Sequence, residues 1–108
     1  MSEQVRCCMI TVIVDVHRLK GYKEETLYIA ASLADRYLAL LTILEQPSPD
    51  LIRLAFVCTL IAAKLEEPIQ PSFNRMIRTI QQMWEFETTK EELVALEQHV
   101  IKLLDFDL

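Results

Sequence analysis

Apolar side chains recur every three or four residues in five segments of the chain, which is the spacing of α-helices that bury one face. The first helix is predicted over residues 2–20, with Ser2 as its N-cap and Gly21 as its C-terminal cap. Its β-branched run, residues 10–14, would also suit a strand, which is the alternative there. The second helix is predicted over residues 24–41, and its alanine-rich middle would let another helix approach closely.

The third segment differs from the others because it is apolar on every side. Residues 54–63 contain no charge, no glycine and no proline, and one threonine is their only polar side chain. A helix without a polar face has to be buried all round, so we expect this helix at the centre, wrapped by the others. It is predicted to begin at Ser48-Pro49-Asp50, read as N-cap, first helical residue and an acid that suits the helix dipole. It is predicted to end before Pro68.

The C-terminal end of this third helix carries an unusual set of charges. Lys64 suits the negative end of the helix dipole, whereas the two carboxylates of Glu66 and Glu67 are locally unfavourable there. Such a local violation is often found at functional sites, and the alternative is a pair of solvated surface acids. Adjacent carboxylates diverge around a helix, so they do not suit acid–base catalysis on a single bond.

Two further helices complete the pattern. Residues 73–84 present apolar side chains on one side and polar side chains on the other. Thr89 and Glu92 form a capping box before the fifth helix, which is predicted to continue to about Leu104. A single glycine among 108 residues leaves little material for hairpin turns, and the dipeptides Asn-Gly and Asp-Gly do not occur. The chain is therefore predicted to form one all-α domain of five helices over residues 1–108.

Composition and charge narrow the class of protein. With 52% hydrophobic and 25% charged residues, the chain is typical of a globular domain with a core of ordinary size. Its 11 basic and 16 acidic side chains give a net charge of −5, which disfavours nucleic acid as a partner. An N-terminal signal pattern is absent, and the apolar run 54–63 is too short to span a bilayer. We therefore expect a soluble protein with no membrane span and no nucleic-acid partner.

Few residues could carry catalysis or bind a metal. Cys7, Cys8 and Cys58 are odd in number and lack a CxxC spacing, so they are predicted to be reduced thiols of a cytoplasmic or nuclear protein. His17 and His99 lie on different predicted helices without a nearby Ser, Asp or Cys motif, so we expect them to be surface or partly buried side chains. A glycine-rich phosphate loop is absent. The residues thus predict no enzyme, no catalytic residue, no cofactor and no metal, and they favour a binding module.

Three stretches of the chain resemble the motifs of the cyclin box. The stretch LIAAKLEE at residues 60–67 resembles the signature "ASKFEE", and ETL at residues 25–27 with ADRYL at residues 34–38 resembles the helix "ETLHLA…DRFL". The ending LEQHVIKLLDFDL at residues 96–108 is similar to "MEHLVLKVLTFDL". The three stretches follow the order of the family and together cover nearly the whole chain. The likeness is strongest to the N-terminal box of A- and B-type cyclins.

The resemblance implies a five-helix box with a central third helix and gives roles to charged residues. Asp35 lies at the edge of an apolar face, where a carboxylate needs a cation. Arg6 falls where the family has an arginine that pairs with the aspartate of "DRFL", so a buried Arg6–Asp35 ion pair is implied. Lys64 and Glu97 match the polar anchors that hold the regulatory helix of a cyclin-dependent kinase. The matching apolar contacts are Leu65, Ile101, Phe106 and Leu108. Without a partner, Lys64 and Glu97 would be an exposed charge pair at a helix end.

The first helix departs from the family pattern. Val12 replaces the large tryptophan of a groove that docks substrate motifs in the family, whereas Asp15 keeps an acid where the family has glutamate. A degenerate docking groove is therefore expected, formed by Val5, Met9, Val12 and Asp15. The resemblance also covers one box only and includes neither the helix before it nor a second box. The sequence leaves open an excised fragment or a natural one-box protein.

Two functions are compatible with these features. The first is a cyclin-like regulatory subunit that binds and allosterically activates a cyclin-dependent protein kinase. The second is a one-box structural or adaptor subunit that uses the same surface inside a larger protein assembly without activating a kinase. The match at Lys64 and Glu97 favours the first.

Overall fold

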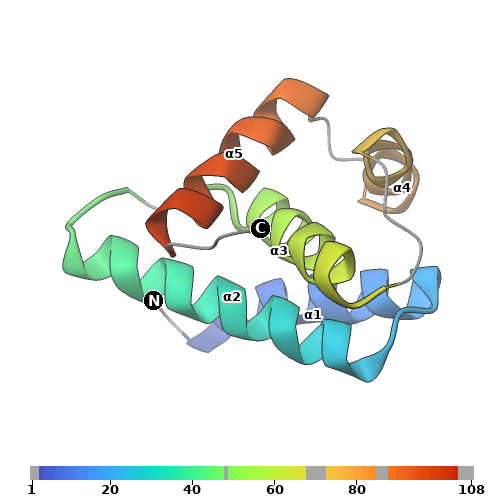
Figure 1. Cartoon of the computed structure of the whole chain (residues 1–108), viewed down its shortest axis with the longest axis horizontal. Helices are drawn as coiled ribbons and strands as arrows, with labels where there is room; N and C mark the ends of the chain where they lie inside the picture. Colours follow the sequence, from blue (N-terminus) through green and yellow to red (C-terminus); the bar gives the residue numbers. More distant parts are fainter. Residues whose placement is uncertain (1–2, 48, 68–72, 85–87, 105–108) are drawn as a thin grey trace.

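In the computed structural model the chain forms five α-helices (Figure 1). They are α1 (Glu3–Lys20), α2 (Glu24–Ile43), α3 (Leu51–Glu66), α4 (Phe73–Trp84) and α5 (Lys90–Leu103). The structure describes residues 3–47, 49–67, 73–84 and 88–104, without the side chains of residues 3–8, 73, 80, 83 and 84. Within these residues every regular element is a helix, which confirms the all-α, five-helix prediction.

Helix α3 lies at the centre, as its uniform apolarity predicts. Figure 1 shows α5 above it and α1 and α2 below it, and α3 packs against all three. Every side chain from Leu54 to Ala63 is at most 1% exposed. The polar member of this run, Thr59, donates its hydroxyl to the carbonyl of Ala55 at 2.8 Å, so no buried donor is left unpaired there. The helix is buried on all sides because it has no face that water would solvate better.

Helix α1 is helical through its β-branched run, so the strand alternative is wrong. Met9, Ile13 and Val16, at spacings of four and three residues, are buried at 1%, 0% and 0% exposure. Burial of this stripe against α2 and α3 outweighs the weak preference of β-branched residues for strands.

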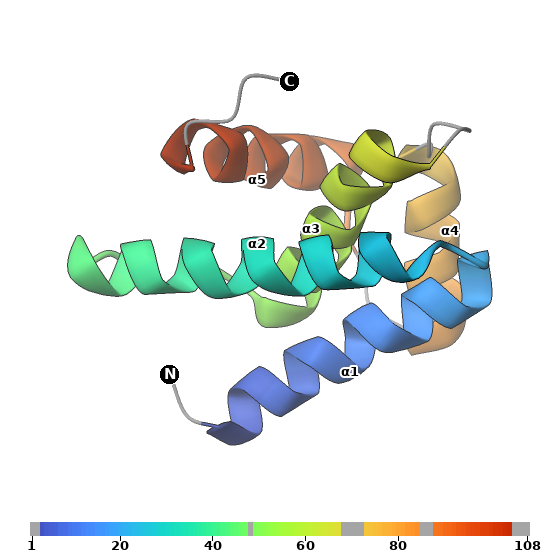
Figure 2. The same cartoon turned by 60° about the horizontal axis from the view of Figure 1, so that its bottom comes forward.

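Helices α2 and α4 complete the packing around α3 and α5. On α2, Ala30 and Ala34 are fully buried, and these small side chains let α2 form its largest interface with α3. Helix α4 lies at one end of the molecule and packs chiefly against α5 (Figure 2). Its Met76 reaches the core with 1% exposure.

The helix ends agree with the sequence except at two places: α2 runs to Ile43, two residues beyond its predicted end, and α3 starts later than predicted. Gly21 ends α1 with φ +65° and Thr89 caps α5 by accepting from the N–H of Glu92, as predicted. The predicted N-cap at Ser48 is wrong, because α3 begins at Leu51 and its N-cap is Asp50. The Asp50 carboxylate accepts from two backbone N–H groups at 2.9 and 3.2 Å. A charged acceptor satisfies the positive end of the helix better than a hydroxyl two residues earlier.

Helix α2 is the one described helix that is long and apolar enough to cross a membrane. The core helix of a globular protein passes the same test, and α2 packs along α1, α3 and α5 with seven buried side chains. These contacts account for its apolar side without a membrane.

Candidate partner-binding site

Lys64 and Glu97 meet where the end of α3 passes the middle of α5. Nζ of Lys64 donates to Oε2 of Glu97 at 2.8 Å. The two side chains are 27% and 12% exposed, so both are partly shielded from water, the glutamate more than the lysine. A partly shielded, hydrogen-bonded pair interacts more strongly than a fully exposed one. The fold thus brings together two residues that are 33 positions apart in the chain.

Aliphatic side chains flank this ion pair on both helices. Leu65, next to Lys64, is 45% exposed, which is high for a leucine. Ile101, one helical turn after Glu97, is half-buried and packs against the core. The other two predicted contacts, Phe106 and Leu108, lie outside the described residues. The described part of the site is therefore an ion pair between an exposed leucine and a half-buried isoleucine.

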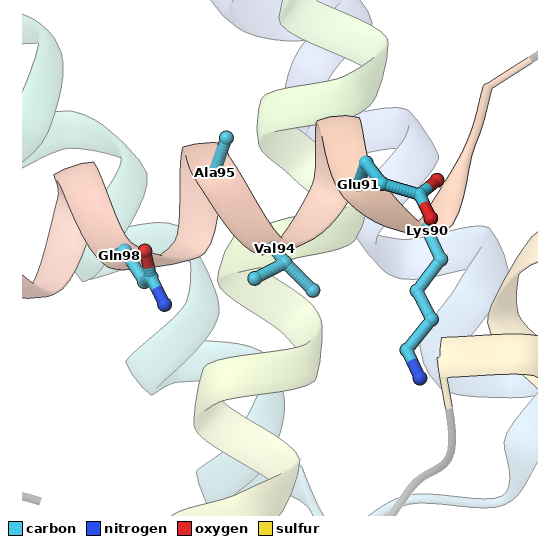
Figure 3. Close-up of a pocket in the computed structure, with 5 residues that line it drawn as sticks. All are labelled: Lys90, Glu91, Val94, Ala95 and Gln98. Atoms are coloured by element: carbon cyan, nitrogen blue, oxygen red, sulfur yellow. The ribbon is translucent and has the colours of Figure 1, made fainter.

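A shallow hollow also lies along α5. Its lining residues all come from α5 and follow one another along the helix in Figure 3: Lys90, Glu91, Val94, Ala95 and Gln98. Val94 is half-buried and lies three residues before Glu97, so the two side chains are neighbours on the helix surface. The sequence analysis did not single out Val94. It extends the aliphatic surface beside the ion pair.

A second ion pair joins α3 to α5 at the opposite end of α3. Nη2 of Arg53 lies 2.8 Å from Oε2 of Glu92, and Nε of Arg53 donates to the hydroxyl of Thr88 at 3.1 Å. Arg53 is in the first turn of α3 and Lys64 is in its last turn. The two pairs therefore tie α5 to α3 on both sides of their crossing and limit how far α5 can rotate.

Helix α5 is also held by α2. The hydroxyl of Tyr37 is hydrogen-bonded to Nδ1 of His99, and the two rings meet edge to face with their centroids 5.6 Å apart. Burial, and to a smaller extent the thiol of Cys58, raises the pKa of Tyr37, so its hydroxyl stays protonated well above neutral pH. The segment of α5 that carries Glu97 is thus anchored to two other helices.

The implied Arg6–Asp35 ion pair stays a prediction. The side chain of Arg6 lies outside the described residues, and Asp35 is half-buried on α2. A half-buried position agrees with the expectation that this carboxylate borders the apolar face of its helix.

The degenerate docking groove also stays a prediction. Met9 and Val12 are 1% and 7% exposed and belong to the core, and Asp15 is half-buried. The side chain of Val5 lies outside the described residues.

The cysteines and histidines behave as packing and surface residues where they are described. Burial raises the pKa of the free Cys58 thiol to about 12, so it is un-ionised at neutral pH and a poor nucleophile. The side chains of Cys7 and Cys8 lie outside the described residues. His17 is half-buried and His99 exposed, as expected. Within the part of the chain that the structure describes, His, Cys, Asp and Glu do not gather as a metal site.

Glu67 has a role that the sequence analysis missed. Its carboxylate lies at the start of α2, where it accepts from the backbone N–H of Lys23 and from the hydroxyl of Thr26. Two signals in the sequence point to this contact when they are read together. Lys23 is a poor N-cap for α2, and Glu67 is unfavourable at the C-terminus of α3. Their contact offsets both disadvantages, because the Glu67 carboxylate lies at the positive end of α2.

Comparison with known proteins identifies related sequences over the same stretch. The family described as "Cyclin, N-terminal domain" matches residues 1–108. A protein named G2/mitotic-specific cyclin S13-7 from Glycine max is 27% identical over 100% of this chain. Cyclin-A1 from Carassius auratus is 32% identical over 94% of the chain, and G2/mitotic-specific cyclin-B3 from Gallus gallus is 27% identical over 100% of it.

The match covers only part of each relative. The chain spans 39% of the Glycine max protein and 25% of each of the other two. The five-helix arrangement around a buried third helix agrees with what the resemblance to the cyclin box implied. Since the family match extends over the entire sequence, the chain belongs to the cyclin family and corresponds to its N-terminal domain.

Proposed function

We propose that this chain is a cyclin-like regulatory subunit that binds a cyclin-dependent protein kinase through the ends of α3 and α5. The observation that carries the proposal is the Lys64–Glu97 pair, which puts a partly exposed lysine beside a largely shielded carboxylate on an aliphatic surface. The ammonium group donates hydrogen bonds and the carboxylate accepts them. The unpaired backbone N–H groups at the N-terminus of a docking helix can donate to the carboxylate, and a backbone carbonyl of the segment that leads into that helix can accept from the ammonium group.

The aliphatic side chains give such a helix something to pack against. Leu65, Val94 and Ile101 border the ion pair, and Leu65 is 45% exposed. Neighbouring apolar contacts exclude water from a polar pair and so strengthen its hydrogen bonds to a partner. Phe106 and Leu108 are proposed to extend this surface.

The proposed mechanism is allosteric and requires no catalytic group from this chain. Docking stabilises the active placement of the kinase helix whose glutamate pairs with the catalytic lysine. A partner shifts such an equilibrium only by its difference in affinity for the two placements. A rigid surface favours one placement over the other, and here Lys64 and Tyr37 hold the segment of α5 that carries Glu97.

A pull-down of a purified cyclin-dependent kinase tests the binding site. The site variant carries Lys64→Ala together with Glu97→Ala, because removing both partners avoids leaving one charge stranded. The matched control carries Arg53→Ala with Glu92→Ala, which removes the other α3–α5 ion pair of equal length. We expect the wild-type chain and the control to retain the kinase and the site variant to lose it. Retention of the kinase by the site variant would contradict the proposal.

A kinase assay then separates activation from simple attachment. We expect the wild-type chain to stimulate phosphorylation by the purified kinase, and the site variant to give no stimulation. Binding without stimulation would favour the alternative of a structural or adaptor subunit.

A further inference from the structure

The last turn of α3, which carries Lys64 and Leu65, is joined to the first turn of α2 by a set of reciprocal contacts. Both oxygens of the Glu67 carboxylate lie 3.3 Å from the backbone N of Lys23, and Oε2 accepts from the Thr26 hydroxyl at 3.2 Å. In the opposite direction, Nζ of Lys23 donates to the backbone carbonyl of Glu66 at 3.3 Å. We refer to Lys23, Thr26, Glu66 and Glu67 as the α2–α3 clasp.

The charges of the clasp match the two helix ends that they touch. The carboxylate of Glu67 lies at the positive N-terminal end of α2, where Lys23 is the N-cap and has no side-chain cap of its own. The ammonium group of Lys23 lies at the negative C-terminal end of α3. Each helix thus receives from the other the cap that its own sequence lacks.

The clasp depends on Glu67 because this residue accepts a hydrogen bond from a buried hydroxyl group. Thr26 is 0% exposed, so its hydroxyl depends on partners inside the protein, and Glu67 accepts from it. The carboxylate also lies close enough to Tyr22 to add to the effect of burial in raising the pKa of that phenol. Glu67 is half-buried and its carboxylate is directed at the start of α2, so its side chain is used by the fold.

We infer that Glu67 is a positioning residue for the partner-binding site and that the clasp holds the last turn of α3 in its binding conformation. This inference rests on the proposed function of Lys64 and Glu97. Glu67 is the C-cap of α3, and its N–H donates to the carbonyl of Ala63 at 2.9 Å. Loss of the clasp lets the last turn fray, and the fraction of molecules that present Lys64 and Leu65 correctly falls.

The expected effect on binding follows from that fraction. The apparent dissociation constant rises in inverse proportion to the competent fraction, so a fall to about one tenth raises it about tenfold. The Lys64 and Glu97 side chains stay chemically intact in such a variant. A role confined to global stability would leave the affinity of the folded molecules unchanged.

The test compares Glu67→Ala with Asp50→Ala. Each substitution removes a carboxylate that caps a helix N-terminus, and Asp50 lies at the opposite end of α3 from the site. Amide hydrogen exchange is measured for residues 64–67, and kinase affinity is measured by titration of each folded variant. For Glu67→Ala we expect exchange about tenfold faster and a dissociation constant about tenfold higher than wild type. For Asp50→Ala we expect both quantities to stay near wild type, and Glu67→Gln, which keeps one acceptor oxygen, should be intermediate.

The outcomes distinguish this inference from the proposed function. If Glu67→Ala leaves amide exchange at residues 64–67 unchanged, the clasp does not hold the last turn of α3. This measurement needs no kinase. Equal kinase affinity of Glu67→Ala and Asp50→Ala overturns the positioning role, and the proposed function stands if Lys64→Ala with Glu97→Ala still abolishes binding. Kinase binding by that last variant overturns the proposed site and with it the positioning role.

Discussion

At the scale of single residues, Cys58 shows how burial shapes a titration that the sequence cannot reveal. The thiol is 0% exposed in the middle of α3, and burial raises its pKa to about 12 from an ordinary value of 9.0. The unfolded chain therefore loses this proton about three pH units before the folded chain does. Between these values the unfolded state binds fewer protons, so raising the pH favours unfolding.

Replacing Cys58 should flatten the alkaline limb of the stability profile. For the wild type we expect this thiol to lower the free energy of unfolding by about 1.4 kcal/mol between pH 7 and pH 10. Cys58→Ala should be less stable at pH 7, because it leaves a small cavity, but its stability should fall less steeply. Urea unfolding under reducing conditions at pH 7, 9 and 10 measures both curves. Tyr22 and Tyr37 titrate in both proteins, so parallel curves would contradict the assignment to Cys58.

At the scale of the helix, the end of α2 adopts a glycine-type cap without a glycine. Glu45 has φ +56°; its N–H donates to the carbonyl of Thr42, and the N–H of Gln46 donates to Leu41. Helix α1 ends with the same bonding pattern, and there the corresponding residue is Gly21 with φ +65°. A side chain in this left-handed region is strained by the contact between its Cβ and the backbone.

Glu45→Gly should therefore stabilise the protein, by about 0.5–1 kcal/mol after the extra entropy of glycine in the unfolded chain is deducted. The matched control is Gly21→Ala, which should destabilise by about 1 kcal/mol through the same conformational term. A Cβ at position 21 would meet no atom within 4 Å, so sterics with neighbouring residues do not contribute. Urea unfolding measures both changes, and the prediction is wrong if Glu45→Gly lowers stability.

The helices themselves could be predicted because their apolar spacing is local information. The central position of α3 followed from one property, its lack of a polar face. The start of α3 was misplaced because Ser48, Pro49 and Asp50 all suit a helix beginning, and only the structure shows that the Asp50 carboxylate reaches two N–H groups. The clasp at Glu67 could not be predicted from either helix alone, since its partners are 41 and 44 residues away.

At the scale of the whole molecule, the fold assembles a surface whose parts are remote in sequence. Hydrophobic periodicity assigns a residue to a face of its helix but does not identify its partner on another helix. The prediction that Lys64 and Glu97 act together therefore came from the resemblance to the cyclin box. The fold joins them at 2.8 Å and surrounds them with contacts that hold α5 against α2 and α3. A partner that binds this surface engages the folded chain only, so its binding energy adds to the stability of the whole domain.

Kinase binding should therefore protect the entire core and not only the contact surface. With free kinase at 100 times its dissociation constant, the free energy of unfolding should rise by about 2.7 kcal/mol. Hydrogen exchange of the amides in the buried stretch 54–63 measures this change, because amides of a fully buried helix are expected to exchange through unfolding of the whole domain. Saturating kinase should raise the free energy of unfolding of the control with Arg53→Ala and Glu92→Ala by as much as that of the wild type. It should not raise that of the variant with Lys64→Ala and Glu97→Ala. Equal protection of all three proteins would mean that the kinase binds elsewhere on the domain.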